Sequence, residues 1–418
     1  MAPSGERTAA SFQQEVIVAD LSPFIKTVRL RNILSFGSEG AEIDLQPLNI
    51  LIGPNTSGKS NFLEVLSLLR SLRRDTELHR DAAGGLWEWK WKGGASEQLP
   101  VLEVVVATSG PTLRYGLSFS SSWMGTAIED EVVQEIGPAS ASRDNRFYYR
   151  NVDGTAIIYP SGLSQFGDTG VPRDLERPKL GPGRSIFSQV KDSLVYPELT
   201  ELGHFFGSIH LMREVQIGAF AGARLPQRSD LPSDFLLEDT RNLGLIINDL
   251  QSKSATWRPL IEKLRDVYPD LEDIHVKIIP GGFVQLLVSQ RGLRDTISVQ
   301  RLSDGTLRYL CLLCVLCHPE PPPVICIEEP ELGLHPDMIH KVAELLREAS
   351  ERTQLIVTTH SDILVSAFND HPEAIVVCER DEDGTHLRRL ESERLKDWLK
   401  DYSLGDLWIS GEIGGTRW

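Results

Sequence analysis

Four short blocks, far apart along the chain, constrain this sequence more than any other feature. Residues 53–60 read Gly-Pro-Asn-Thr-Ser-Gly-Lys-Ser, and residues 302–306 read Leu-Ser-Asp-Gly-Thr. Residues 324–331 read Val-Ile-Cys-Ile-Glu-Glu-Pro-Glu, and residues 357–361 read Val-Thr-Thr-His-Ser. Each block is short enough to arise by chance, but all four in this order predict one ATP site that a second copy of the protein completes.

The first block has the complete G-x-x-x-x-G-K-S spacing of a phosphate-binding loop. Residues 48–52 read as a short buried strand and residues 61–69 as an amphipathic helix, so the loop joins a strand to a helix. Glycines let the backbone N–H groups face the phosphates, and the helix N-terminus adds partial positive charge. We expect Lys59 to neutralise the β- and γ-phosphates and Ser60 to ligate Mg²⁺. The expected nucleotide-binding residues are Gly53, Pro54, Asn55, Thr56, Ser57, Gly58, Lys59, Ser60 and Asn61.

The third block supplies acidic groups. Residues 324–327 are an uncharged apolar run, and two carboxylates follow directly. Ligands of α/β sheets bind at the C-terminal ends of the strands. We therefore expect Glu328 to hold the Mg²⁺ shell and Glu329 to polarise the attacking water. Residues 331–335, between two prolines, form a tight segment that is suited to cross a subunit boundary.

These blocks resemble the ABC-type ATPase superfamily, in the branch with RecF, the structural-maintenance-of-chromosomes (SMC) proteins and the OLD-type ATPases. Within that branch the chain is similar to the bacterial "predicted ATPase" group with an IEEPE-x-x-LHP block. The resemblance runs from about residue 24 to residue 363, except the variable middle, and includes the opening residues 28–36. It implies an α/β fold: an ABC-type P-loop ATPase head with a mixed sheet, an antiparallel β-subdomain and a helical insert. It also implies ATP and Mg²⁺ as cofactors and a homodimer of ATP-sandwiched heads.

The resemblance assigns roles residue by residue. Ser303 and Gly305, with Asp304 between them, match the signature motif that touches the γ-phosphate of the opposite subunit. His360 matches the switch histidine that senses the γ-phosphate. The implied catalytic residues are Lys59, Glu329 and His360, and the implied metal ligands are Ser60 and Glu328.

The chain departs from the wider superfamily in three places. Asp304 and Thr306 replace the usual glycine and glutamine of the signature. Glu328 stands where the Walker B acid is more often aspartate, so its carboxylate reaches one methylene further. No glutamine matches the Q-loop, and the surroundings of Gln98, the nearest candidate, differ from that motif. The coupling between ATP and the middle region therefore lacks its usual residue.

Composition is that of an ordinary globular protein, with 41% hydrophobic and 24% charged residues. The longest apolar stretch, residues 309–317, is too short to span a bilayer. Residues 1–20 are polar, lack the apolar core of a signal peptide and are expected to form a loose tail. We expect a cytoplasmic protein without a membrane partner.

The formal net charge of −16 argues against a surface that coats DNA, because such binding depends on many phosphate contacts. A local basic patch is still compatible with this charge. Arg70, Arg73 and Arg74 are expected on one face of the helix after the phosphate loop, with Arg80 beyond it. This face is either simply solvated or a contact for DNA or an acidic partner.

Cysteines recur at every third position in residues 311–317, and His318 follows. This spacing is compatible with a metal site. However, the cysteines lie within a continuous apolar helix, where cysteine behaves as a small buried hydrophobe. We expect core packing for these three and reduced thiols at Cys326 and Cys378 as well.

The chain divides into four expected parts. After the tail, residues 21–158 form the strand-rich first half of the head, in which residues 87–91 place three tryptophans on one face of a strand. Residues 159–273 read as a helical insert or lid. Residues 274–418 complete the head and end in a glycine- and tryptophan-bearing tail.

Asp381 and Asp383 raise the question of a metal-dependent nuclease centre. OLD-type nucleases carry a Toprim domain after their ATPase, but too few residues follow His360 here for such a domain. The pair Asp383-Gly384 favours a hairpin turn, so we expect both aspartates to be turn residues.

The leading functional interpretation is a dimeric ATP-driven switch that regulates a separate effector, such as a nuclease, in DNA maintenance or anti-phage defence. Two alternatives stay open. One is a stand-alone RecF-like DNA repair ATPase, which tight and salt-sensitive DNA binding would reveal. The other is the nucleotide-binding subunit of a transporter, which a membrane partner would reveal.

Overall fold

The computed structural model describes residues 24–74, 85–94, 98–122, 125–137, 146–152, 155–161, 173–175, 183–213, 215 and 217–415. The expected N-terminal tail, Arg80 and the last three residues of the expected C-terminal tail lie outside these ranges. No helix among the described residues is both long enough and apolar enough to cross a membrane.

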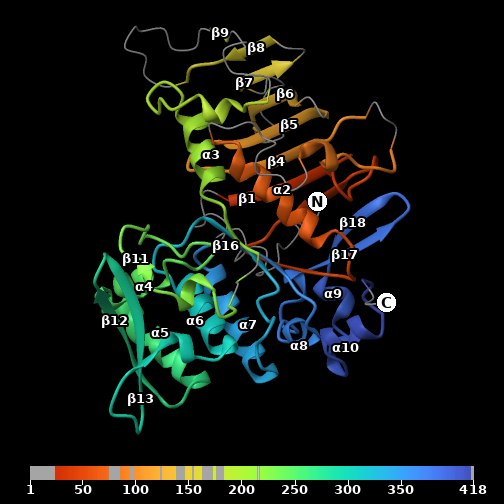
Figure 1. The fold of residues 1–418 in the computed structure, drawn as a ribbon. Coiled ribbons are helices and arrows are strands. Elements are labelled where there is room, and N and C mark those ends of the chain that lie inside the picture. The colour runs from red at the N-terminus through yellow and green to blue at the C-terminus, as the bar shows by residue number, and fades with distance from the viewer. Residues whose placement is uncertain are drawn as a thin grey trace, which may run out of the picture.

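A six-stranded sheet forms the centre of the molecule, in the order β10-β15-β16-β3-β17-β18 (Figure 1). The first five strands run parallel, and β18 pairs antiparallel with β17, so the sheet is mixed as expected. Strands β3 and β16 are buried along their whole length because both faces of the sheet are covered. The strands are β3 (Leu48–Ile52), β10 (His210–Met212), β15 (Val324–Glu328), β16 (Gln354–Thr358), β17 (Ile375–Asp381) and β18 (Gly384–Arg389).

An eight-stranded antiparallel sheet, at the top of Figure 1, is the expected β-subdomain. Its order is β2-β1-β4-β5-β6-β7-β8-β9. Burial alternates along β4, which is typical of a sheet with one face on a core. The strands are β1 (Phe24–Arg31), β2 (Ala41–Asp44), β4 (Val101–Ala107), β5 (Thr112–Ser122), β6 (Gly125–Glu135), β7 (Phe147–Val152), β8 (Thr155–Ile158) and β9 (Arg173–Leu175).

Two hydrophobic cores separate the layers. Leu51 of β3 faces one core with helices α2 (Lys59–Ser71) and α3 (Pro197–Gly207) and the antiparallel sheet. Its neighbours Ile50 and Ile52 face the other core, which is built with helices on the opposite side. Those helices are α6 (Asp304–Leu316), α7 (Pro336–Ser350), α8 (Asp362–Ser366) and α10 (Leu404–Ile409). The short helix α9 (Ser392–Leu395) precedes α10.

A third, small sheet lies at the lower left of Figure 1. It contains β11 (Gln227–Arg228), β12 (Leu271–Ile279), β13 (Phe283–Gln290) and β14 (Ile297–Ser298), and helices α4 (Leu243–Ser252) and α5 (Ser254–Val267) join its core. Helices α3, α4 and α5 all come from residues 159–273, the stretch expected to be a helical insert. The same stretch also supplies β10 to the central sheet. With three residues, β10 is too short to show a periodic pattern.

The three tryptophans of residues 87–91 do not share a strand face, so that prediction was wrong. Leu86–Trp89 is a 3-10 helix, in which residues two apart point in different directions. Trp87 is 51% exposed, whereas Trp89 is 5% exposed. The tryptophans alternate with charged residues, as in a strand. The segment is too short for this periodicity to distinguish a strand from a 3-10 helix.

Candidate ATP site

The phosphate loop connects β3 to α2, as expected from its flanks. Two of its positions must be glycine because neighbouring atoms leave no room for a Cβ atom. A Cβ on Gly53 would lie 2.2 Å from the carbonyl oxygen of Cys378, and one on Gly58 would lie 2.4 Å from Oγ1 of Thr385. Thr56 adopts a φ of 69°, so the loop curls tightly before the helix begins at Lys59. The result is a cradle of backbone that a side chain would fill.

Lys59 lies across this cradle. Its Nζ donates hydrogen bonds to the carbonyl oxygens of Gly53 at 2.8 Å and Pro54 at 2.9 Å. Burial lowers the pKa of Lys59, while the neighbouring thiol of Cys378 and carboxylates of Glu329 and Glu328 act in the opposite direction. The ammonium group therefore lies between the phosphate loop and the acids of the third sequence block. We call residues 328–331 the acid block.

Ser60 and Glu328 bring the first and third sequence blocks together, although 268 positions separate them. The Ser60 hydroxyl donates to Oε1 of Glu328 at 2.5 Å. The contact forms because β15, β16 and β3 are parallel, which places their C-terminal ends at one edge of the sheet. A hydroxyl and a carboxylate are hard oxygen donors beside a phosphate cradle, so these two residues fit a magnesium ion that also binds phosphate oxygens.

Glu329 and His360 meet next to this contact. Glu329 has a φ of 46°, uncommon for a residue with a side chain, and its N–H donates to the carbonyl oxygen of Thr358 at 3.0 Å. This turn brings Oε1 of Glu329 to 3.6 Å from Nε2 of His360, and both side chains remain partly exposed. The structure thus places the expected catalytic glutamate beside the expected switch histidine.

Glu331 is a residue of this cluster to which the sequence reasoning assigned no role. Its Oε1 accepts hydrogen bonds from Oγ1 of Thr359 at 2.6 Å and from the backbone N–H of His360 at 2.9 Å. Burial raises the pKa of the Glu331 carboxyl, and these hydrogen bonds offset part of that effect. The usable signal was the third acid of the Glu-Glu-Pro-Glu run, because a buried carboxylate needs hydrogen-bond donors.

The signature residues lie at the N-terminus of α6. The Ser303 hydroxyl caps the helix and accepts from the N–H of Thr306 at 3.1 Å, and Asp304 pairs with the buried Arg224. A Cβ on Gly305 would lie 3.1 Å from the carbonyl oxygen of Gly333. Among the described residues, no hydrogen bond or ion pair joins these three positions to the phosphate loop. The structure therefore joins three of the four blocks by close contacts, and it places the signature against the segment that follows Glu331.

Two arginines, not foreseen from the sequence, hold the signature end in place. Arg224 donates to the carbonyl oxygens of Gln300 and Leu302, each at 2.9 Å. Arg308, in the first half of α6, donates to the carbonyl oxygens of Leu332 and Val215. The signal for Arg308 was a charged residue inside an otherwise apolar helix. It ties α6 to the segment after Glu331.

The three cysteines pack in the core as expected, and of the two aspartates Asp381 ends β17 and Asp383 lies in the following turn. Cys311 and Cys314 are fully buried in the core, Cys317 is partly buried, and all three are free thiols. Burial raises the pKa of Cys311 to about 12. Asp381 and Asp383 lie at the β17–β18 turn, where the N–H of Asp383 donates to Oδ1 of Asp381 at 2.9 Å.

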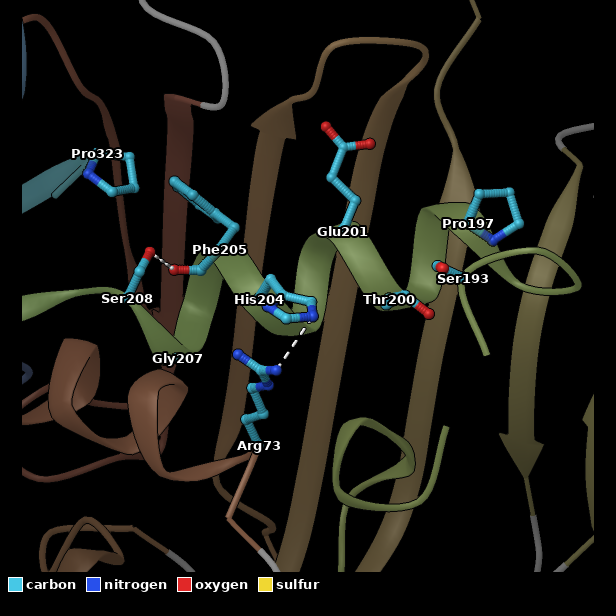
Figure 2. A pocket seen from close by; sticks show the side chains of 10 residues that line it. All are labelled: Arg73, Ser193, Pro197, Thr200, Glu201, His204, Phe205, Gly207, Ser208 and Pro323. Carbon is cyan, nitrogen blue, oxygen red and sulfur yellow. Dashed lines mark hydrogen bonds between the residues drawn. The ribbon is translucent and has the colours of Figure 1, made fainter. Parts of the chain in front are cut away.

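The arginines after the phosphate loop do not form one helix face, because α2 ends at Ser71 and Arg73 and Arg74 follow it. Arg70 pairs with Glu238. Arg73 instead lines a cavity of about 590 Å³ beside α3, where its guanidinium lies 3.1 Å from Nε2 of His204 (Figure 2). Pro323, at the N-terminal end of β15, also lines this cavity. The cavity therefore lies at the N-terminal end of β15, whereas Glu328 lies at the C-terminal end of the same strand. It is not the nucleotide site.

Comparison with known proteins agrees with this geometry. A family model described as "AAA domain, putative AbiEii toxin, Type IV TA system" matches residues 48–366, more than half of the chain. A 174-residue segment is 42% identical to the "Old nuclease" of Escherichia phage P2. It covers 37% of this chain and 29% of that nuclease, so the chain matches less than a third of its relative.

Among solved structures, the SmcHead bound to the C-winged helix domain of ScpA has a TM-score of 0.51 with this chain at 16% identity. The alignment covers 89% of this chain and 99% of that one. At this identity the likeness concerns the fold, which is that of an ATPase head. The chain therefore belongs to the "AAA domain, putative AbiEii toxin, Type IV TA system" family and is an ABC-type ATPase of the RecF/SMC/OLD-like branch.

Proposed function

We propose that this chain binds ATP with Mg²⁺ and hydrolyses it, and that the nucleotide closes a dimer of two heads which hydrolysis reopens. The observation that carries the proposal is the 2.5 Å hydrogen bond between Ser60 and Glu328, which joins the phosphate loop to the acid block. Glu329, the next residue, lies beside His360. The residues proposed to cradle the phosphates, hold the metal, activate the water and sense the γ-phosphate thus lie together at one sheet edge.

Each residue has a separate task in this proposal. Lys59 exchanges its bonds to loop carbonyls for bonds to phosphate oxygens and so neutralises charge that is present before hydrolysis. Ser60 and Glu328 hold Mg²⁺, which would shield the phosphate charge. Glu329 orients and polarises the attacking water, and His360 contacts the γ-phosphate. Ser303 to Gly305 serve the nucleotide of the second subunit, and the exposure of Ser303 and Asp304 supports this role.

We further propose that the switch regulates a separately encoded effector, a nuclease, in DNA maintenance or anti-phage defence. The support is a relative named as a nuclease, which is 42% identical to this chain over 174 residues. The chemistry on DNA is assigned to a second protein. The net charge of −16 agrees with a protein partner better than with extensive contact to phosphates.

Measuring ATP turnover by the purified chain tests the first part. Glu329→Gln should keep ATP binding and lower turnover about 10²–10⁴-fold, the usual contribution of a general base. Glu393→Gln, which removes an exposed carboxylate on α9, is the control and should hydrolyse ATP at the native rate. If Glu329→Gln also turns over normally, the base is another group.

Incubating the chain with DNA and Mg²⁺ tests the second part. We expect no cleavage without a partner. Robust cleavage that Asp381→Ala or Asp383→Ala abolishes would place a nuclease centre in this chain. Tight, ATP-dependent and salt-sensitive DNA binding would instead favour a stand-alone RecF-like repair ATPase.

A further inference from the structure

An aromatic surface near the C-terminal end of the described chain has no role in the ATP site. It is built by the 3-10 turn Trp398–Lys400 and by α10. Trp398, Tyr402 and Ile409 are 46%, 53% and 49% exposed. They flank a groove of about 420 Å³ whose lining residues are Trp398, Tyr402, Asp406, Leu407, Ile409, Ser410 and Glu412.

The apolar side chains of this groove form one patch. The rings of Trp398 and Tyr402 have their centroids 6.2 Å apart. A partner that covers these side chains would remove their apolar surface from water, which favours binding. Tryptophan and tyrosine also dominate the binding energy of protein interfaces, whereas scattered exposed hydrophobic residues do not. The patch therefore has the composition of an interface core.

The polar side chains of the groove specify the charge of its occupant. Asp406 and Glu412 line it, and no lysine or arginine does among the residues that the structure describes. Hydrogen bonds from the hydroxyl and N–H of Ser403 hold the pKa of the Asp406 carboxyl below its ordinary value, so this group is anionic at neutral pH. An apolar segment flanked by lysine or arginine complements this pattern.

The chain's own first 23 residues do not match the groove in charge. They contain Glu6, Glu15 and Asp20 against Arg7. A second copy of the same surface would bring carboxylates against carboxylates. Like charges across an interface are unfavourable, so both self-derived occupants are disfavoured relative to a basic partner.

We propose that this groove is the docking site for a lysine- or arginine-rich amphipathic helix of a partner protein. The proposal rests on the proposed function, in which a separate effector responds to the ATPase. It goes further by assigning the surface and the chemistry of the segment that binds there.

The groove is connected to the ATP site on two sides of α10. On one side, α10 packs on α8, which follows His360: Oγ of Ser366 lies 3.1 Å from Oγ of Ser403, and the N–H of Leu404 donates to Oδ1 of Asn369 at 2.7 Å. On the other side, the indole of Trp408 donates to the carbonyl oxygen of Gly415.

Gly415 in turn lies against the phosphate loop. A Cβ on Gly415 would be 3.4 Å from Cα of Gly53. The helix that forms the groove is therefore anchored next to both the switch histidine and the phosphate loop. A partner bound in the groove would bias, and be biased by, the state of the ATP site to the same extent.

The test uses the full chain and a fluorescein-labelled model helix of 18 residues, with leucine at positions i, i+3, i+4 and i+7 and lysine at the other positions. Fluorescence anisotropy measures its affinity at physiological salt. We expect Trp398→Ala and Ile409→Asp each to weaken binding at least about tenfold, the scale of one interface anchor. Trp87→Ala, which removes an equally exposed tryptophan elsewhere, should leave the affinity unchanged.

A matched helix with glutamate in place of every lysine should not bind. Equal binding of the two helices would overturn the charge complementarity. Equal loss of affinity in Trp398→Ala and Trp87→Ala would overturn the groove as the binding site. ATP turnover of the free Trp398→Ala chain, which should equal that of the unaltered chain, separates the two proposals. An unaltered chain without turnover contradicts the proposed ATPase, whereas normal turnover with no peptide binding contradicts only the docking site.

Discussion

The two parts of the ATP site differ in how they are held. The acid block is bonded within the chain, through Ser60 to Glu328 and through Glu331 to the backbone of His360. The signature end points outward: the side chain of Asp304 is 73% exposed, and the Ser303 hydroxyl bonds to Thr306 in its own helix. One part is held by hydrogen bonds within a single chain, whereas Ser303 and Asp304 of the other are exposed.

The difference follows from the architecture. Parallel strands bring their C-terminal ends to one edge of the sheet, so blocks that follow β3, β15 and β16 must meet. The signature follows the small third sheet and begins a helix on the opposite side of the central sheet. In the proposed function, hydrolysis would depend on residues at the edge of one sheet, whereas closure would depend on the signature at the start of α6.

The largest effect should come from a substitution in the phosphate loop, which faces the acid block within the same chain. Lys59→Ala should weaken ATP binding about 100-fold or more, about 3 kcal/mol, because it removes the ammonium group proposed to donate to the phosphate oxygens and neutralise their charge. Titration with a fluorescent ATP analogue measures this change. Lys92→Ala, at an exposed ion pair, is the control and should bind ATP normally. Equal affinities of the two variants would exclude the phosphate loop as the main anchor.

Mixing variants tests whether the signature serves a second subunit. Lys59→Ala and Ser303→Arg chains should each be inactive alone. An equal mixture should recover about a quarter of the native ATPase, since half of the dimers are mixed and each holds one intact composite site. No recovery, with mixed dimers demonstrated by subunit-specific tags, would show that each chain supplies its own signature.

Glu331 should act through the position of His360. Glu331→Ala removes the acceptor of two hydrogen bonds, so we expect kcat to fall about tenfold or more with KM little changed. Glu331→Gln keeps an acceptor and should restore most of the rate. Thr359→Val removes only the hydrogen bond from the threonine hydroxyl, so its kcat should lie between those of Glu331→Ala and Glu331→Gln. A loss that glutamine does not restore would indicate that the negative charge itself is required.

The same variant has a predictable dependence on pH. Burial raises the pKa of Glu331, so the folded state favours its protonated form. Ionising this carboxyl costs stability above its unfolded pKa, and that cost grows until the raised folded pKa is passed. Melting temperatures should therefore show Glu331→Gln gaining on the unaltered chain as pH rises from acid toward neutral. A difference that is independent of pH would contradict the shift.

The smallest effect should come from a substitution in the exposed signature, and it concerns the free energy of unfolding. Asp304→Asn keeps the shape but removes the charge beside Arg224, and this partly exposed pair is worth about 0–1 kcal/mol. Thermal unfolding of the isolated chain should change little. A large destabilisation would mean that the signature is held as firmly as the acid block.

Prediction from sequence succeeded where the residue pattern is local. The phosphate loop lies between a buried strand and a helix, the apolar run before Glu328 is a strand, and Asp383-Gly384 forms a turn. It failed where the element was short or ended early: Leu86–Trp89 is a 3-10 helix, and α2 stops at Ser71 before two of the expected arginines. Periodicity over fewer than about two turns does not identify an element.

The sequence by itself determined which groups can meet ATP, because a lysine, a serine and two glutamates at these spacings have few other uses. Only the tertiary structure decided that Glu331 holds the backbone of His360, that Arg308 ties α6 to the loop after Glu331, and that Gly415 lies against Gly53. These contacts join residues far apart in the chain or depend on burial. They arise when strands align and helices pack on both sides of the sheet, which no local pattern encodes.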